Sequence, residues 1–383
     1  MTDRLAGLIA RPTIADEISP MSGLDEYLIH NNPFPVRVMW TSDPRAYERV
    51  CFCILDNEAQ LQISLGMAFY PNLGTAEAFA IVNHRGTHRT VRAHCLLGED
   101  RMDMTVGPIR IDVIRPFEHL HLSVDDNDHD IRLEIDWFET KRPTYRDYGD
   151  MVNHLAMGRP RAGYEGFGRQ EGWVQVGDDR IEMIPGRFRG SRDHHWGTRK
   201  GVGGPSLGRS QFHADHYHSG EFVEFSAWGI FADNVFYNYG DERRSSPVRR
   251  AERQLRFDPK TKMLVGGDAT ILLDNGETKQ YSFERVFEMA AFLRCGMYGG
   301  YGGRGGTPKG DIWQGQYVGD LVVSGEAYDV TDPATQWELS GLDQCLARFT
   351  SDGEEVIGIV ETENAVVHDA ATRGHRGLSV ASD

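Results

Sequence analysis

The sequence lacks the long apolar runs from which membrane helices are made. A membrane-spanning helix needs about 20 consecutive apolar residues, and no stretch of the 383-residue sequence approaches that length. The N-terminal residues carry a short apolar patch at 5–10, but neither the apolar core nor the cleavage site of a signal peptide. We therefore expect a cytoplasmic protein that does not insert into a membrane.

Basic residues are scarce relative to acidic ones. The chain has 41 Lys and Arg against 57 Asp and Glu, a formal net charge of −16. A nucleic-acid backbone is bound by Lys and Arg side chains that neutralise its phosphates. This balance argues against a nucleic-acid partner, and we predict none.

Several short motifs of cofactor and nucleophile chemistry are also missing. The five cysteines are an odd number without a Cys-x-x-Cys pair, which argues against a thiolate metal site. Cys51 and Cys53 alternate with Phe52 in an apolar run, so we expect both as small core residues in a reduced compartment. No Gly-x-Ser-x-Gly elbow and no Gly-x-Gly-x-x-Gly after a strand is present, which argues against a serine hydrolase and a nucleotide-binding doubly wound fold.

The dominant pattern that is present consists of short runs of alternating or β-branched and aromatic residues, separated by Gly, Asn, Asp and Pro. About eight or more strands are predicted in each half, the spacing expected of sandwiches or barrels. Residues 274–276, Asp-Asn-Gly, predict a hairpin turn. The chain is too long for one ordinary core. We predict an all-β protein with an N-terminal domain at 1–165 and a C-terminal domain at 166–383.

Helical periodicity is scarce, and two connecting segments stand out. Residues 145–157 predict one helix, ended by Gly158 and Pro160, that connects the two halves. The Gly-rich run 299–306 lacks the Lys-Ser/Thr of a phosphate-binding loop, and we interpret it as a hinge or lid loop.

Histidine is unevenly distributed. Five of the fifteen histidines lie between His194 and His218. If residues 191–199 form a strand, Arg192, His194 and Trp196 point to one face, while Asp193 and His195 point to the other. Imidazole suits acid–base catalysis because its unperturbed pKa of about 6.5 lies near neutral pH. A single histidine would be read as structural, but the cluster together favours a functional site.

Metal binding is the alternative interpretation of the same cluster. His216 and His218 would share a face of a strand, which is a chelating spacing, and Asp215 or His194 could complete the ligand set. The order of residues in 213–218 matches no established ligand signature. We therefore predict no metal, and keep a metal-dependent hydrolase that uses the His194–His218 cluster as an alternative.

The segment 191–199, Ser-Arg-Asp-His-His-Trp-Gly-Thr-Arg, resembles the Arg-Asp-His-Ser-Trp-Gly-x-Arg signature of a lipocalin-like, two-domain bacterial family. That family is distantly related to carotenoid 1,2-hydratases (hydroxyneurosporene synthases) and to the lipocalin-like Diels–Alderases of fungal polyketide pathways. Further similar pieces are 69–72, 106–110 with Pro116, and 171–174. His195 departs from the signature, where Ser is usual, and 309–313 lacks the His that often precedes Gly in the late Gly-Trp segment.

The resemblance implies two lipocalin-like β-barrel or sandwich domains, a substrate pocket at or near their interface and usually no cofactor. Characterised relatives act on terpenoid, polyketide or similarly apolar molecules. The leading prediction is a cofactor-independent lyase or isomerase that hydrates, dehydrates or cleaves a carbon–carbon bond of a small apolar metabolite. A non-catalytic carrier of such a metabolite is the second hypothesis. A homodimer is an arrangement that the sequence leaves open.

The predicted acid–base residues are His194 and His195, with Asp193 orienting one of them. Because adjacent strand residues face opposite sides, we predict that His194 transfers the proton in the cavity and that His195 is held in the wall. The predicted substrate contacts are Arg192, Trp196, Arg199, Tyr217, Tyr298 and Trp313.

Overall fold

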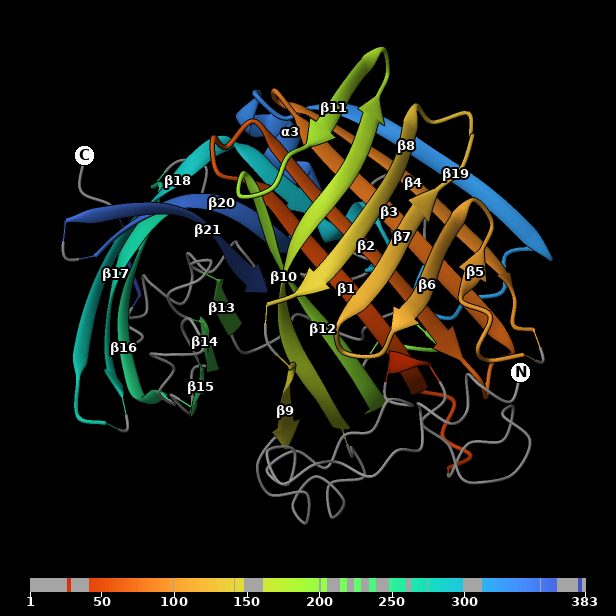
Figure 1. The fold of residues 1–383 in the computed structure, drawn as a ribbon, viewed down its shortest axis with the longest axis horizontal. Coiled ribbons are helices and arrows are strands. Elements are labelled where there is room, and N and C mark those ends of the chain that lie inside the picture. Colours follow the sequence, from red (N-terminus) through yellow and green to blue (C-terminus); the bar gives the residue numbers. More distant parts are fainter. Residues whose placement is uncertain are drawn as a thin grey trace.

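The computed structural model describes most of the chain. It covers residues 26–28, 41–98, 100–140, 142–147, 161–199, 201–204, 214–218, 224–228, 234–238, 248–259, 263–273, 275–298, 312–351, 353–363 and 378–380. These residues form two β-sheets, with one short α-helix and a 3-10 turn (Figure 1). The predicted all-β fold is confirmed.

The first sheet has 13 strands and curls around its own core, in orange to green in Figure 1, with blue β19 at one edge. Its pairing order is β19-β4-β3-β2-β1-β12-β10-β8-β7-β6-β5, and β9 and β11 pair with β10. The strands are β1 (Ala46–Asp56), β2 (Leu61–Tyr70), β3 (Thr75–His84), β4 (Thr87–Leu96), β5 (Thr105–Val106), β6 (Ile109–Arg115), β7 (His119–Val124), β8 (Ile131–Glu139), β9 (Thr144–Asp147), β10 (Arg161–Val176), β11 (Asp179–Met183), β12 (Phe188–Thr198) and β19 (Leu321–Asp329).

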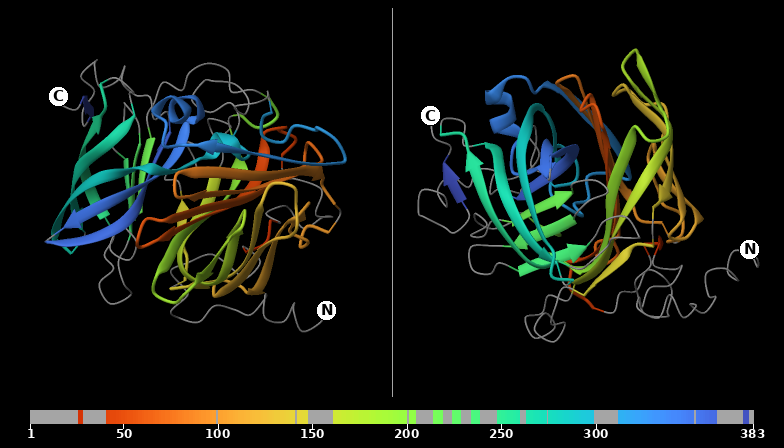
Figure 2. Two further views of the ribbon diagram at one scale, coloured as in Figure 1. Left: turned by 90° about the horizontal axis from the view of Figure 1, so that it is seen from above. Right: turned by 60° about the vertical axis from the view of Figure 1, so that its left-hand side comes forward.

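The second sheet has nine strands in the order β15-β14-β13-β21-β20-β18-β17-β16-β22. It curls as well, because β15 comes back into contact with β16 (Figure 2). The only parallel pair among the described strands is β16 with β22. The strands are β13 (Ala214–His218), β14 (Glu224–Trp228), β15 (Asn234–Asn238), β16 (Val248–Phe257), β17 (Leu264–Leu273), β18 (Thr278–Phe292), β20 (Leu342–Ser351), β21 (Glu354–Glu363) and β22 (Leu378–Val380).

Strand β1 is buried along its whole length because its two faces belong to two different cores. Val50 and Phe52 point into the core that the first sheet encloses, with Trp137 of β8. Cys51 and Cys53 point the other way, into a core that the first sheet shares with β18, β20 and β21. The prediction that these cysteines share one side as small core residues is confirmed. The first sheet therefore packs one face against the second sheet.

The connector helix predicted at 145–157 is wrong in the part that the structure describes, residues 145–147. Residues 145–147 belong to strand β9, where Tyr145 pairs with Tyr164 of β10. Backbone pairing with a distant strand has overridden the local helical pattern. Residues 148–160 lie outside the described part of the chain, as does the Gly-rich run 299–306. The α-helix, α3 (Pro333–Leu339), starts after Asp332, whose side chain accepts hydrogen bonds from the backbone amides of the first turn.

The hairpin turn predicted at 274–276 falls between β17 and β18, which pair antiparallel with Leu272 opposite Thr278. The division into domains at residue 165 stays a prediction. The first sheet continues beyond that residue through β12 and also takes up β19.

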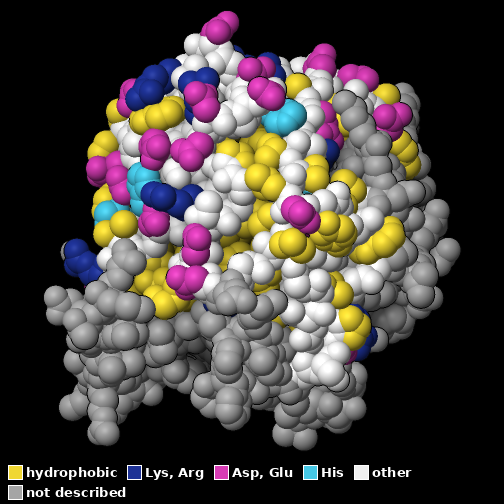
Figure 3. Space-filling model, turned by 90° about the vertical axis from the view of Figure 1, so that its right-hand side faces the viewer, with side chains coloured by type: hydrophobic (Ala, Val, Ile, Leu, Met, Phe, Trp, Pro, Cys, Tyr) yellow, Lys and Arg dark blue, Asp and Glu magenta, His cyan; other side chains and the backbone are white. Residues whose placement is uncertain are grey.

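The surface of the first sheet carries charges of both signs. In Figure 3, Lys and Arg side chains lie scattered among Asp and Glu, with hydrophobic side chains between them. Leu321 and Val323 of β19 are exposed apolar residues of this sheet. Within the described residues, no helix has the length and hydropathy that crossing a membrane requires.

Candidate functional site

The motif strand β12 lies in the middle of the first sheet, between β1 and β10. Because side chains alternate along a strand, Arg192, His194 and Trp196 face the core inside the first sheet. Asp193 and His195 face the second sheet. The predicted alternation is therefore present, and it divides the predicted site residues between two separate clusters.

The inner cluster is built around the buried guanidinium of Arg192. Its NH2 donates to Glu26 Oε1 at 2.6 Å, its Nε donates to Glu139 Oε1, and its NH1 donates to the Tyr164 hydroxyl at 3.2 Å. Two carboxylates thus flank one cation that is shielded from water. Burial raises the pKa of Glu139 to about 7, although Arg192 opposes this shift.

His194 is fully enclosed in the same inner cluster. The Tyr164 hydroxyl donates a hydrogen bond to Glu26 Oε1 at 2.6 Å. Its oxygen is therefore left to accept a hydrogen bond from His194 Nδ1 at 2.9 Å. The other ring nitrogen of His194, Nε2, lies 3.0 Å from Glu48 Oε1, within hydrogen-bonding distance. Protein groups therefore occupy both nitrogens of His194. The half-buried Trp196 lies edge-on to this ring, with 5.6 Å between ring centroids.

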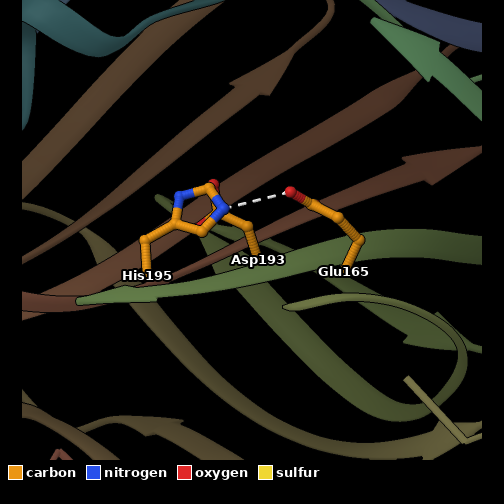
Figure 4. Close-up of side chains that lie close together, drawn as sticks. All are labelled: Glu165, Asp193 and His195. Atoms are coloured by element: carbon orange, nitrogen blue, oxygen red, sulfur yellow. Dashed lines mark hydrogen bonds and ion pairs between the residues drawn. The ribbon is translucent and has the colours of Figure 1, made fainter. Parts of the chain in front are cut away.

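The outer cluster is built around His195 on the opposite face (Figure 4). His195 Nε2 lies 3.1 Å from Glu165 Oε1. Its Nδ1 lies 3.2 Å from Arg49 NH2, and the same NH2 donates to Asp193 Oδ2 at 2.9 Å. A guanidinium can only donate, so Nδ1 accepts and Nε2 carries the proton towards Glu165. In this arrangement the Nδ1 lone pair lies beside the Arg49 guanidinium, and Nε2 faces the Glu165 carboxylate.

Two predicted substrate contacts, Arg199 and Tyr298, belong to this outer cluster. Two guanidinium groups contact the Tyr298 ring, whose centroid lies 5.1 Å from the Arg49 Cζ and 5.4 Å from the Arg199 Cζ. Burial is the largest single influence on the pKa of Arg49 and lowers it, but Asp193, acting together with Tyr298, Tyr47 and Cys51, holds this pKa well above its usual value. Burial also raises the pKa of Tyr298, which keeps its hydroxyl protonated.

Glycine at position 163 permits this arrangement. Gly163 of β10 lies directly opposite His195. A Cβ atom at this position would lie 2.1 Å from His195 Cδ2 and 2.5 Å from the backbone oxygen of His194. The imidazole lies over the space that a side chain on β10 would fill.

The remaining predicted contacts are less defined. Tyr217 lies in β13, opposite Val360 of β21, and its side chain is outside the described part of the structure. The same holds for His216 and His218, so their proposed chelation is not described either. Trp313 is half-buried in the loop before Gly315, whose carbonyl oxygen accepts from Thr75 Oγ1 at the start of β3. Among the described residues, a polar surface pocket with Arg89 and Asp179 contains none of the predicted site residues.

A metal ion fits the outer cluster poorly. Ligand atoms of Glu165, Asp193 and His195 lie within 4.8 Å of one another, the one such group among the described residues. However, Arg49 already binds Asp193 and His195. A divalent ion about 4 Å from this guanidinium would be repelled by about 8 kcal/mol at an effective dielectric constant of about 20. The residues present are arranged for a guanidinium rather than for a metal ion.

Sequence reasoning missed the partners that define both clusters. They are Glu26, Glu48, Arg49, Glu139, Tyr164 and Glu165. Each is a common residue type in an ordinary strand or segment, without a motif of its own. Only the pairing of β12 with β1 and β10 brings four of them to the histidines.

Comparison with protein families identifies the group to which the chain belongs. A family of unknown function, DUF8625, matches residues 21–218, more than half of the chain and all of the motif strand. The chain is a member of DUF8625. No curated protein matches it.

Solved structures resemble the chain at low sequence identity. A candidate AttH from Nitrosomonas europaea has 12% identity and a TM-score of 0.49, over 85% of this chain and 94% of its own. Kievitone hydratase from Nectria haematococca has 10% identity and a TM-score of 0.49, over 92% and 96%. CghA, solved with Sch210972, has 11% identity and a TM-score of 0.46, over 83% and 88%. The function is argued below from the residues of the chain itself.

Proposed function

We propose that this DUF8625 member is a cofactor-independent lyase or isomerase that adds or removes water on a small, largely apolar metabolite. His195 acts as the acid–base residue. The proposal keeps the reaction class that the sequence suggested but moves the proton-transferring role from His194 to its neighbour.

The observation that carries the proposal is the bonding around His195. Its Nδ1 accepts a hydrogen bond from Arg49 at 3.2 Å, while Glu165 holds the opposite side of the ring. A general base needs an accepting lone pair whose ring is oriented by a second group. His194 differs because its two nitrogens face oxygen atoms, the Tyr164 hydroxyl and the Glu48 carboxylate, rather than an obligate donor. Asp193, with 23% of its side chain exposed, provides the approach to the outer cluster.

The reaction can be written with these groups alone. His195 Nδ1 takes a proton from a carbon next to a carbonyl group. Arg49 donates to the carbonyl oxygen as it gains negative charge, which replaces its bond to Nδ1. The imidazolium then returns the proton to a neighbouring hydroxyl, which leaves as water while the double bond forms. Hydration is the same sequence in reverse, and retro-aldol cleavage would start from the hydroxyl proton instead.

Glu165 acts as a positioning residue in this scheme. Its carboxylate accepts a hydrogen bond from Nε2–H of His195, so the lone pair of the ring is at Nδ1. The same carboxylate stabilises the imidazolium once that forms. Asp193 holds Arg49 in place and faces the same site.

A carrier of hydrophobic metabolites is the competing function. A carrier site is lined mostly by apolar groups, with few polar ones. Here a cation, two carboxylates and an imidazole are buried or half-buried together, and ordering such groups away from water is unfavourable unless they are used or fully paired. This concentration of charge favours the enzyme.

The test is a screen of the purified protein against aromatic, terpenoid and polyketide β-hydroxy carbonyl compounds and their unsaturated counterparts. Mass spectrometry would detect the gain or loss of one water. We expect His195→Gln to lower the rate at least about a hundredfold. His88→Gln is the matched control, since His88 is a buried histidine of β4 whose ring accepts a hydrogen bond from the Phe292 amide. Binding without turnover by the wild-type protein would support the carrier instead.

A further inference from the structure

One row of residues crosses the first sheet at the level of His195. His195 of β12 lies directly opposite Arg49 of β1, which lies opposite Ala68 of β2. Ala68 lies opposite Glu77 of β3, and Glu77 lies opposite His94 of β4. Directly opposed residues of antiparallel strands project from the same face. The row therefore places a second histidine–carboxylate pair on the face that carries the proposed catalytic histidine.

This second pair is buried and includes a tyrosine. Glu77 Oε1 accepts from the hydroxyl of Tyr70, and Glu77 Oε2 lies 3.4 Å from His94 Nδ1. Burial, reinforced by the negative charge of Glu77, raises the pKa of Tyr70, so the hydroxyl remains a donor. We refer to Tyr70, Glu77 and His94 as the far pole, and to Arg49 and His195 as the near pole.

The far pole has unused hydrogen-bonding capacity. Side-chain exposure of His94 is 4%, yet neither ring nitrogen makes a hydrogen bond with a described residue. Most buried side-chain polar atoms in proteins do have a partner, and leaving one without a partner costs about 1–3 kcal/mol. An imidazole with two such atoms is suited to a polar group of a ligand.

Several residues between the poles are apolar. Ala68 presents only a methyl group there, and it belongs to the same buried core as Phe79 and Tyr298, whose rings lie edge-on to each other with 6.2 Å between their centroids. Neighbouring strands are about 4.8 Å apart, so the backbones of Arg49 and Glu77 are separated by about 10 Å and those of the two histidines by about 19 Å. These dimensions match two fused or linked six-membered rings with a polar group at each end.

We infer that the far pole is a second binding end of the proposed active site, and that the substrate is an elongated apolar molecule with a hydroxyl or carbonyl group at both ends. His94 and Tyr70 bind one end while His195 and Arg49 act on the other. The inference rests on the proposed function, since it assigns the substrate class of the same site.

The test compares two binding probes of the same shape. The diol para,para′-biphenol has a hydroxyl at each end, whereas para-phenylphenol has one. We expect calorimetry to show that the wild-type protein binds the diol about tenfold tighter, the effect of one additional hydrogen-bonded end. His94→Gln and Glu77→Gln should remove this preference while they leave monophenol binding unchanged. His88→Gln, from the same face of β4, should keep it.

Three results would overturn the inference. These are equal affinities for the two probes in the wild-type protein, absence of diol binding, or a preference that persists in both far-pole variants with native melting temperatures. Failure of the proposed function has a different signature, because it would appear as the absence of water transfer by the wild-type protein, or as water transfer that is unchanged when His195 is replaced. The two proposals can therefore fail separately.

Discussion

Glu139 offers a quantitative test of the inner cluster through the pH dependence of stability. Its Oε1 accepts from Arg192 Nε and from Trp137 Nε1 at 3.0 Å. Its Oε2 is buried and has no hydrogen-bond partner among the described residues. Burial raises the pKa of this carboxyl from 4.5 to about 7, with Arg192 opposing and Glu26 adding to the shift. The perturbation is Glu139→Gln, which keeps the shape and removes the titration.

The sign follows from the direction of the pKa shift. A carboxyl whose pKa is higher in the folded than in the unfolded state binds its proton more tightly when folded. The stabilisation of the folded state by this carboxyl is complete below about pH 4.5 and is lost as the pH rises through about 7. A rise of the pKa from 4.5 to about 7 corresponds to roughly 3 kcal/mol of stability. Part of this energy is shared with Arg192 and Glu26, so roughly 3 kcal/mol is the upper end.

The assay is urea unfolding followed by tryptophan fluorescence at about pH 5 and about pH 8. We expect the free energy of unfolding of Glu139→Gln, relative to wild type, to increase by about 1–3 kcal/mol between these two pH values. Glu118→Gln is the control, since Glu118 is an exposed carboxylate paired with Arg115. A relative stability that is flat, or that falls as the pH rises, would refute the buried, partly protonated state of Glu139.

Three further predictions concern the motif strand. Gly163→Ala should destabilise the protein by about 1–3 kcal/mol, because the new Cβ would lie 2.5 Å from a backbone oxygen; an unchanged urea midpoint would contradict this. His194→Gln should lower the melting temperature by several degrees, because its contacts with Tyr164 and Glu48 are lost. His195→Gln should mainly lower turnover. The reverse pattern would support the proton-transferring role first predicted for His194. Removal of metals with a chelator should leave melting temperature and turnover unchanged, because Arg49 lies where a metal ion would bind; loss of both with release of stoichiometric zinc would favour the hydrolase alternative.

The sequence predicted those properties that depend on local alternation. The period of two along 191–196 correctly separated His194 from His195, and the alternation of Cys51 and Cys53 correctly placed both in one core. The helix predicted at 145–157 was wrong at its start, since Tyr145 pairs with Tyr164. Helical propensity is a weak local preference, and a ladder of backbone hydrogen bonds to a distant strand outweighs it.

By itself, the sequence determined that the chain forms strands and that the motif offers different groups on its two faces. Only the tertiary structure decided what each face meets. Arg49 reaches His195 across 146 residues of sequence, and Glu48 reaches His194 in the same way, because β1 pairs with β12. Strand pairing over such separations is fixed by the joint burial of all the apolar faces, which no single segment encodes. The partners of the two histidines, and hence their proposed roles, depend on that pairing.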